Sequence, residues 1–150
     1  MRALIQRVLE AEVEVQGNVV SRIGPGLCVF VCAMKGDTDE DIQYIARKVA
    51  TLKLFEQDGK MRFSVLDVAA EVLVVSQFTL AARTRKGTKP SFDDAEKPPQ
   101  AEVLIQRFVE ELRKLGINPK EGVFGAYMKV RLINDGPVTI WLDSKDKGPR

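Results

Sequence analysis

The stretch LCVFVCAM, residues 27–34, consists of apolar side chains throughout. Its β-branched and aromatic centre is typical of a strand that is buried on both faces. The valine-rich stretch EVLVVSQ, residues 71–77, predicts a second buried strand. Both runs are much shorter than the about 20 apolar residues that a membrane-spanning helix needs. The two stretches therefore predict the interior of a folded domain.

Two cysteines, Cys28 and Cys32, lie in the first of these runs. In a strand this spacing places both side chains on one face but about 13 Å apart, at roughly 3.3 Å per residue. That separation is too long for an internal disulfide, and a zinc site would need further ligands. We therefore predict two reduced core cysteines in a cytoplasmic protein.

Around these strands the sequence predicts one α+β domain over residues 1–150, with a mostly antiparallel, barrel-like sheet and two main helices. Apolar and polar residues alternate near the N-terminus, and helical spacing follows Thr38 and Pro98-Pro99. We expect the charged tail, residues 144–150, to be frayed. The expected strands are residues 2–16, 19–23, 27–34, 71–77, 127–133 and 138–142, and the expected helices are residues 39–52 and 98–115.

The composition excludes several classes of catalytic site. The 150 residues include 23 Lys and Arg, 21 Asp and Glu, and no histidine. Neither a Ser-His-Asp nor a Cys-His arrangement can be built within such a chain, and a His-based zinc site is excluded as well. We expect no metal and no cofactor. Chemistry would have to come from carboxylates, hydroxyls, backbone dipoles or the substrate itself.

The segment SQFTL, residues 76–80, comes at the carboxyl end of the second buried strand. Turn-forming hydroxyls at a strand end explain it without any function. Alternatively, backbone N–H groups and the side chains of Ser76, Gln77 and Thr79 form a site for an acyl or phosphate oxygen. Thr79 has no histidine to activate it and is not N-terminal, so neither common route to a threonine nucleophile exists.

Two further segments stand out. In NDGPVT, residues 134–139, a turn between strands explains the Asn, Asp, Gly and Pro, although Gly-Pro also offers exposed carbonyls with little side-chain bulk. In RTRKGTKPSF, residues 83–92, four cations lie within seven residues and an aromatic side chain follows. This loop is either solvated or a patch for a nucleic-acid backbone, with Phe92 as a stacking surface.

In this order and at this spacing, the three segments resemble the D-aminoacyl-tRNA deacylase family. The resemblance covers nearly the whole chain and includes ALIQRV at residues 3–8, Ile23-Gly24 and Gly59-Lys60-Met61. SQFTL and NDGPVT are its most specific parts. Three positions depart from the family pattern: Arg62, Arg83 and Lys89 stand where asparagine, aspartate and arginine are common.

The resemblance implies a homodimer with the active site at the subunit interface. It implies hydrolysis of the ester that joins a D-amino acid, or glycine, to the terminal adenosine of tRNA, without a cofactor and away from any membrane. Gly136-Pro137 would be a cis peptide that reaches into the partner's pocket, where its carbonyls bind the amino group and exclude an L side chain. Arg7 would hold that motif in orientation.

The resemblance also assigns the remaining site residues. The pocket around the scissile ester would be lined by Ser76, Gln77, Phe78 and Thr79. The loop near the CCA end of the tRNA would contribute Arg85, Lys86, Lys89, Ser91 and Phe92. We expect backbone N–H groups near Phe78 and Thr79 to stabilise the oxyanion and a ribose hydroxyl of the substrate to assist, which is an RNA-assisted mechanism.

Three other interpretations stay open at this point. The chain could be a non-catalytic RNA-binding module that uses residues 83–92, which predicts binding without ester turnover. A protein-interaction domain is the second interpretation. The third is an unrelated threonine-dependent hydrolase, which predicts a covalent acyl adduct on Thr79.

Overall fold

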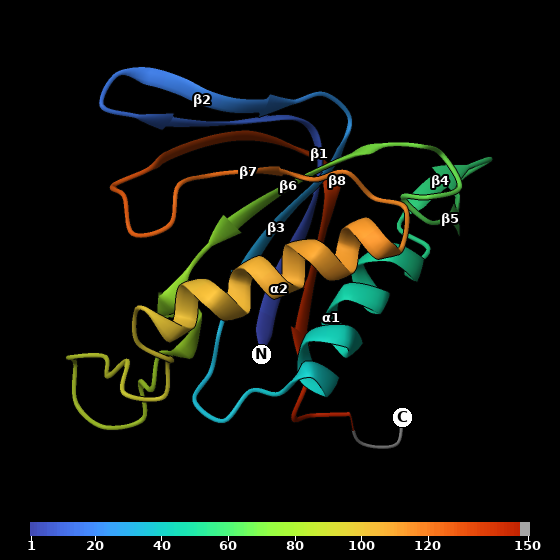
Figure 1. The fold of residues 1–150 in the computed structure, drawn as a ribbon. Helices are drawn as coiled ribbons and strands as arrows, with labels where there is room; N and C mark the ends of the chain where they lie inside the picture. Colours follow the sequence, from blue (N-terminus) through green and yellow to red (C-terminus); the bar gives the residue numbers. More distant parts are fainter. Residues whose placement is uncertain (148–150) are drawn as a thin grey trace.

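The computed structural model describes residues 1–147 and shows one curved sheet with two helices packed against it (Figure 1). The longest strands are β1 (Arg2–Val15) and β8 (Lys129–Asp143), which run antiparallel. β8 lies along one edge of β1, while β3 (Gly26–Cys32) and β2 (Asn18–Ile23) share the other edge. The sheet continues from β3 through β6 (Glu71–Ser76) to the short β7 (Lys120–Glu121).

The sheet is mixed, and it curls toward closure. β3, β6 and β7 are parallel neighbours, whereas every pairing of β1 is antiparallel. At the far end, the Nζ atom of Lys120 on β7 donates to the carbonyl of Arg22 on β2, at 2.8 Å. This contact between opposite ends of the sheet gives the barrel-like form, as the sequence predicts.

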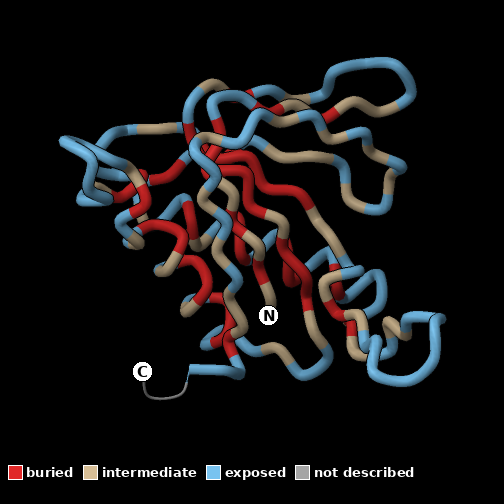
Figure 2. Tube along the Cα trace, turned by 180° about the vertical axis from the view of Figure 1, so that it is seen from behind, coloured by how far each residue is buried: buried red, intermediate tan, exposed pale blue. Residues whose placement is uncertain are grey.

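Both helices cover the same face of the sheet, where they lie next to each other (Figure 1). Helix α1 (Asp39–Thr51) and helix α2 (Gln100–Lys114) bury apolar stripes against Ile5, Val29 and Val74. Figure 2 shows the buried residues running through the central strands and the inner sides of the helices. A second cluster on the opposite face includes Val8 and Leu73 and is closed by the curl of the sheet.

The C-terminal strands differ from the expected hairpin. The expected turn at residues 134–137 lies within the single strand β8, because Asn134 and Thr139 both pair with β1, opposite Val8 and Gln6. Residues 135–138 therefore bulge out opposite the single residue Arg7. A bulge of this kind re-aims side chains while both flanking ladders continue, which is why the strand does not reverse.

Three short elements were not among the expected ones. The strands β4 (Phe55–Gln57) and β5 (Lys60–Phe63) form a separate hairpin, and the 3-10 helix η1 (Phe78–Ala81) follows β6. The hairpin projects beside the carboxyl end of α1 in Figure 1. Such elements of three or four residues are too short to show a period in the sequence.

The start of the charged tail is held rather than frayed. Ser144 is buried, its hydroxyl donates to Asp41 at 2.7 Å, and its N–H donates to the Met1 carbonyl at 2.9 Å. The N-terminal ammonium donates to Ser144 Oγ and to Asp37, each at 2.6 Å. Polar groups buried with partners give this segment an anchor that its composition does not reveal. The expectation for residues 148–150 lies outside the described residues.

Candidate active site

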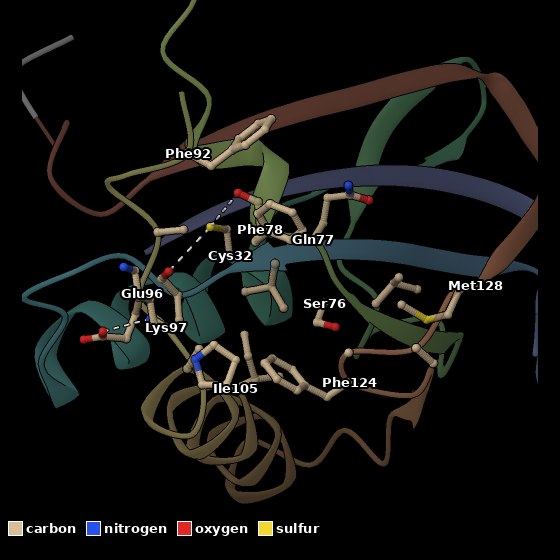
Figure 3. Close-up of a pocket in the computed structure, with 18 of the residues that line it drawn as sticks. Cys32, Ser76, Gln77, Phe78, Phe92, Glu96, Lys97, Ile105, Phe124 and Met128 are labelled. Carbon is tan, nitrogen blue, oxygen red and sulfur yellow. Dashed lines mark hydrogen bonds between the residues drawn. The ribbon is translucent and has the colours of Figure 1, made fainter. Parts of the chain in front are cut away.

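A cavity of about 690 Å³ lies at the carboxyl ends of β3 and β6. Its wall also receives residues from the N-terminal part of α2 and from the loop between β7 and β8 (Figure 3). The parallel pair β3–β6 ends here, and the carboxyl ends of parallel strands are a common place for a binding crevice. The lining includes Val31, Cys32, Val75, Ser76, Gln77, Phe78, Phe92, Glu96, Lys97, Ile105, Phe124, Tyr127, Met128 and Val130.

The wall is mostly apolar, with polar groups concentrated where β6 ends. Ser76 and Gln77 line it there, and Figure 3 shows the Ser76 side chain between those of Phe78 and Phe124. A pocket with an apolar wall and a few placed polar groups is the usual form of a small-molecule or nucleoside site. Three of the four pocket residues named from the sequence, Ser76, Gln77 and Phe78, therefore lie on one cavity.

The fourth residue, Thr79, does not line this cavity. It is exposed on η1, and its hydroxyl accepts a short hydrogen bond from the Gln77 side-chain amide. An amide is not a general base, so this contact supplies no group that could activate Thr79 as a nucleophile.

The backbone at this point leaves two donors without a partner. The Gln77 N–H donates to Val31 O at 2.8 Å, and the Leu80 N–H donates to Gln77 O at 3.3 Å. Between them, the N–H groups of Phe78 and Thr79 make no hydrogen bond to any residue of the described part of the chain. Two adjacent free N–H groups beside a cavity are suited to bind an oxygen that gains negative charge.

An aromatic pair stands at the cavity wall above these groups. The rings of Phe78 and Phe92 are 5.3 Å apart between centroids and meet edge to face, at 81°. Phe78 is 60% exposed although it is a large apolar side chain. Figure 3 shows both rings on the same side of the cavity as Gln77. Exposed aromatic rings of this kind offer a stacking surface for a base.

The basic loop, residues 83–92, is exposed, and only Phe92 of its predicted site residues lines the cavity. Arg85, Lys86 and Lys89 are exposed, while Ser91 pairs through its backbone with Arg83. The Arg83 guanidinium is bound by Asp94, which raises the pKa of Arg83 through a hydrogen bond and charge attraction. Arg83 is therefore already paired, and the three other cations remain available to an anion.

The Gly136–Pro137 segment lies elsewhere, directly after Asp135, which lines a second cavity of about 550 Å³ together with Arg7, Glu56 and Glu71. The Arg7 guanidinium is buried and donates to Asp135 O at 2.8 Å and 3.1 Å. It also donates to Leu54 O at 2.7 Å. None of the residues that line this second cavity lines the first one, so one chain does not bring its two most specific motifs together.

The expected cis form of Gly136–Pro137 is not observed. The cis peptide bond of the described residues is Pro98–Pro99, and Gly136–Pro137 is trans. The bulge of β8 accounts for the local geometry, because Gly136 has a φ of +91° and both flanks stay paired with β1. A Cβ atom added at Gly136 would lie 2.8 Å from Nη2 of Arg7, so the glycine permits this close approach.

Neither a metal-binding cluster nor a reactive thiol is found among the described residues. No group of three or more Cys, Asp or Glu within residues 1–147 is arranged to hold a metal ion. Burial raises the pKa of the Cys28 thiol to about 12 and that of the Cys32 thiol to about 11, so both are protonated near neutral pH. No helix in this part of the chain is both long and apolar enough to span a membrane.

Several cavity residues were missed by the sequence reasoning. Phe124, Met128 and Tyr127 come from the loop between β7 and β8, and Glu96 and Lys97 come from the segment between the basic loop and α2. Ile105 was expected only as part of the apolar face of a helix. The one signal available was the glycine of FGAYM, residues 124–128, where Gly125 has a φ of +77°.

The fold and site together define a class of protein. The family model described as "D-Tyr-tRNA(Tyr) deacylase" matches residues 4–143. A solved structure named "c-Myc DNA Unwinding Element Binding Protein" superposes with a TM-score of 0.89 at 42% identity, over 95% of this chain and 98% of that one. One named "Structural Analysis of a probable eukaryotic D-amino acid tRNA deacylase" has a TM-score of 0.79 at 19% identity, over 94% and 97%. The class is that of tRNA deacylases.

Curated relatives narrow the class to one family. A D-aminoacyl-tRNA deacylase of Paracoccus denitrificans is 56% identical over 148 residues, which are 98% of this chain and 99% of that protein. The one of Aquifex aeolicus is 49% identical over 147 residues, 97% and 99% of the two chains. The chain belongs to the D-aminoacyl-tRNA deacylase family, whose members are hydrolases of aminoacyl-tRNA esters.

Proposed function

We propose that this protein hydrolyses the ester of D-aminoacyl-tRNA, and of glycyl-tRNA, to free tRNA and the amino acid. The observation that carries the proposal is the pair of unpartnered N–H groups at Phe78 and Thr79 beside the apolar cavity. Water attacks the ester carbonyl, the two N–H groups bind the oxyanion of the tetrahedral intermediate, and the ribose oxygen leaves with a proton. Aminoacyl esters are already activated, so this modest apparatus suffices.

The proton transfer is proposed to be RNA-assisted. The sequence contains no histidine, and the side chain that hydrogen-bonds to the Thr79 hydroxyl is the Gln77 amide, which is not a base. The ribose hydroxyl next to the scissile ester is then the nearest group able to position or activate the attacking water. On this proposal Thr79 shapes the site through its backbone, and Ser76 and Gln77 contact the bound aminoacyl-adenosine.

Selection against L substrates is proposed to come from a second copy of the chain. Gly136 and Pro137 are exposed on β8, and the buried Arg7 guanidinium donates a hydrogen bond to the carbonyl of Asp135, the residue before them. β8 pairs only with β1 among the described residues, so its outer edge is open to a partner. In a homodimer across this edge, the Gly136-Pro137 carbonyls would bind the amino group of the substrate and leave no room for an L side chain.

The exposed cations of the basic loop are proposed to hold the CCA end of the tRNA. Arg85, Lys86 and Lys89 would contact phosphates, which makes binding dependent on salt concentration. Ser91 and Phe92 would contact the last nucleotides, where Phe92 leads directly into the cavity wall. These contacts support a role in the proofreading of aminoacyl-tRNA during translation in the cytoplasm.

The direct test is incubation of the protein with matched D- and L-aminoacyl-tRNA and with glycyl-tRNA. We expect rapid release of the D-amino acid and of glycine while the L ester persists. Equal cleavage of the D and L forms, or of neither, would contradict the proposal. Tight RNA binding without turnover of any ester would favour the RNA-binding module instead.

Single-turnover cleavage by the Thr79→Ala variant tests the RNA-assisted mechanism. We expect cleavage to persist, because the backbone N–H at this position is retained. Complete loss of cleavage with tRNA binding intact would overturn the RNA-assisted version. Mass spectrometry of the wild-type reaction provides a second readout, since an acyl adduct on Thr79 would identify a covalent hydrolase.

A further inference from the structure

One side chain connects the 3-10 helix at the cavity with the C-terminal strand. Nη1 of Arg2 donates to the Leu80 carbonyl at 2.9 Å, which is the third residue of η1. Nε of the same guanidinium donates to Asp143 Oδ2 on β8 at 3.1 Å. Its Cζ atom lies 5.7 Å from the ring centroid of Trp141, within the range of a cation–π contact.

These contacts come from the sheet register. Arg2 pairs with Asp143 across β1 and β8 and with Cys32 across β1 and β3, so it is the residue at which η1, β3 and β8 meet. The Arg2 side chain is only 25% exposed and Asp143 is 17% exposed, so this ion pair is more sheltered than a typical surface pair. Partly sheltered, multiply bonded guanidinium groups hold a fixed geometry.

The carbonyl that Arg2 binds controls the direction of η1. In a short 3-10 helix the carbonyls point toward the carboxyl end and the N–H groups point the opposite way. The Leu80 N–H donates to Gln77 O, and the Leu80 carbonyl is bound by Arg2, so residue 80 is fixed at both ends of its backbone. A second contact lies behind the helix, where Cys32 Sγ is 3.6 Å from the Phe78 carbonyl.

We propose that Arg2 is a positioning residue for the deacylation reaction, which aims the Phe78 and Thr79 N–H groups by binding the Leu80 carbonyl against β8. This inference rests on the proposed function of those two N–H groups. Arg2 does not touch the substrate in this arrangement. Its second partner, Asp143, lies on the strand that carries Gly136 and Pro137, so the same side chain links the oxyanion-binding backbone with the strand proposed to meet the partner.

The test compares Arg2→Met with Arg131→Met, a matched control. Arg131 also joins β8 to β1, through Glu12 and Glu14, but it makes no contact with η1. We expect Arg2→Met to lower kcat for D-aminoacyl-tRNA by about tenfold or more, because small misplacements of a reacting geometry are costly. KM is expected to change by less than about twofold, since the binding contacts remain. Arg131→Met is expected to keep the wild-type kcat.

Two further variants keep the test decisive. Arg2→Lys retains a cation able to reach one acceptor at a time, so kcat should recover partly. Asp143→Asn leaves the Leu80 contact and should lower kcat less than Arg2→Met does. An unchanged kcat in folded Arg2→Met, or a raised KM with normal kcat, would overturn the inference, because the latter pattern belongs to a residue that binds RNA. If Arg2→Met does not fold, a wild-type kcat for Arg2→Lys together with Asp143→Asn overturns it.

The failure of this inference can be told apart from the failure of the proposed function. If the wild-type protein does not cleave D-aminoacyl-tRNA, the proposed function fails and no variant is informative. If the wild-type protein cleaves the D ester and Arg2→Met cleaves it at the same rate, only the positioning role of Arg2 fails.

Discussion

The two most specific motifs of this chain, SQFTL at residues 76–80 and NDGPVT at residues 134–139, are supported in different ways. The first follows a buried strand and opens into a cavity of about 690 Å³ formed within one chain. The second is a bulge on an edge strand, which is held by the β1 pairings on both flanks and by hydrogen bonds from the Arg7 guanidinium. A motif of the first kind is completed by its own core. A motif of the second kind is presented outward and needs another surface to act on.

The largest expected effect concerns Arg7, the side chain that binds the bulge. Arg7→Met would leave the buried Leu54 carbonyl without its donor and would remove both hydrogen bonds to the partly buried Asp135 carbonyl. We expect the free energy of unfolding to fall by about 3 kcal/mol, since each unpaired buried group costs about 1–3 kcal/mol. Urea denaturation measures the loss. A loss of less than about 0.5 kcal/mol, the range of an ordinary surface substitution, would show that the bulge does not need the Arg7 hydrogen bonds.

The next largest effect is expected from a substitution of Gly136, the glycine of the bulge. Gly136→Ala places a Cβ atom 2.8 Å from Nη2 of Arg7 at a φ of +91°. We expect hydrolysis of D-aminoacyl-tRNA to fall about 100-fold, as a misplaced positioning group can cause. The matched control is Gly17→Ala, whose φ of +81° carries the same backbone strain with no atom within 4 Å. If both variants lost activity equally, backbone strain alone would account for the loss. If Gly136→Ala kept the wild-type activity, the position of the bulge would not matter for hydrolysis.

Asp41 belongs to neither motif, so its substitution tests whether a loss of stability alone changes the rate of deacylation. Burial opposes ionisation of Asp41, but hydrogen bonds from the Thr38 N–H, Ser144 and Lys145 outweigh it and hold the pKa of Asp41 below its usual value. The ionised group therefore stabilises the fold above its unfolded pKa of about 3.9, and this contribution is lost as pH falls through the folded-state pKa.

Asp41→Asn is accordingly expected to lower the free energy of unfolding by about 2 kcal/mol at pH 7, because it breaks a charge-assisted network. The difference from the wild type should shrink as the pH falls below about 4. Denaturation at a series of pH values measures it. Deacylation at pH 7 should keep the wild-type rate in the folded variant. A stability difference that grows toward low pH would contradict the assignment.

The smallest effect concerns the cavity wall. Phe78→Ala removes one ring of the edge-to-face pair with Phe92 and a side chain that is 60% exposed. We expect about a tenfold rise in KM for aminoacyl-tRNA, because stacking on an aromatic ring is worth about 1–3 kcal/mol per base. The free energy of unfolding should barely change. Val20→Ala, another exposed apolar residue, is the control and should alter neither quantity. An unaltered KM would remove Phe78 from the binding surface.

Sequence reasoning finds the parts of this molecule that are periodic. The alternation of β1, the apolar runs of β3 and β6 and the stripes of both helices predict elements that lie within one or two residues of those observed. The bulge of β8 differs from the hairpin turn that the sequence predicts, because Asn-Asp-Gly-Pro favours a turn locally, whereas the long-range pairing with β1 continues on both sides of the bulge.

In the candidate site, too, some residues follow from a local sequence pattern and others depend on tertiary contacts. Ser76, Gln77 and Phe78 could be placed at a cleft because they end a buried strand. The wall formed by Phe124 and Met128 could not, because a loop residue shows no period and its neighbours are set by the tertiary fold. The role of Arg2 depends on the register between three elements far apart in the sequence, and no local pattern contains that information.

The bulge of β8 has a consequence for solubility. An open edge strand of 15 residues offers backbone groups on which further chains can stack without limit. Pro137 has no N–H to give to such a ladder, and the left-handed backbone of Gly136 interrupts the run of extended residues. The four residues that push out opposite Arg7 thus divide the longest edge of the sheet into two shorter ones, and short, interrupted edges are a general way to limit edge-to-edge aggregation.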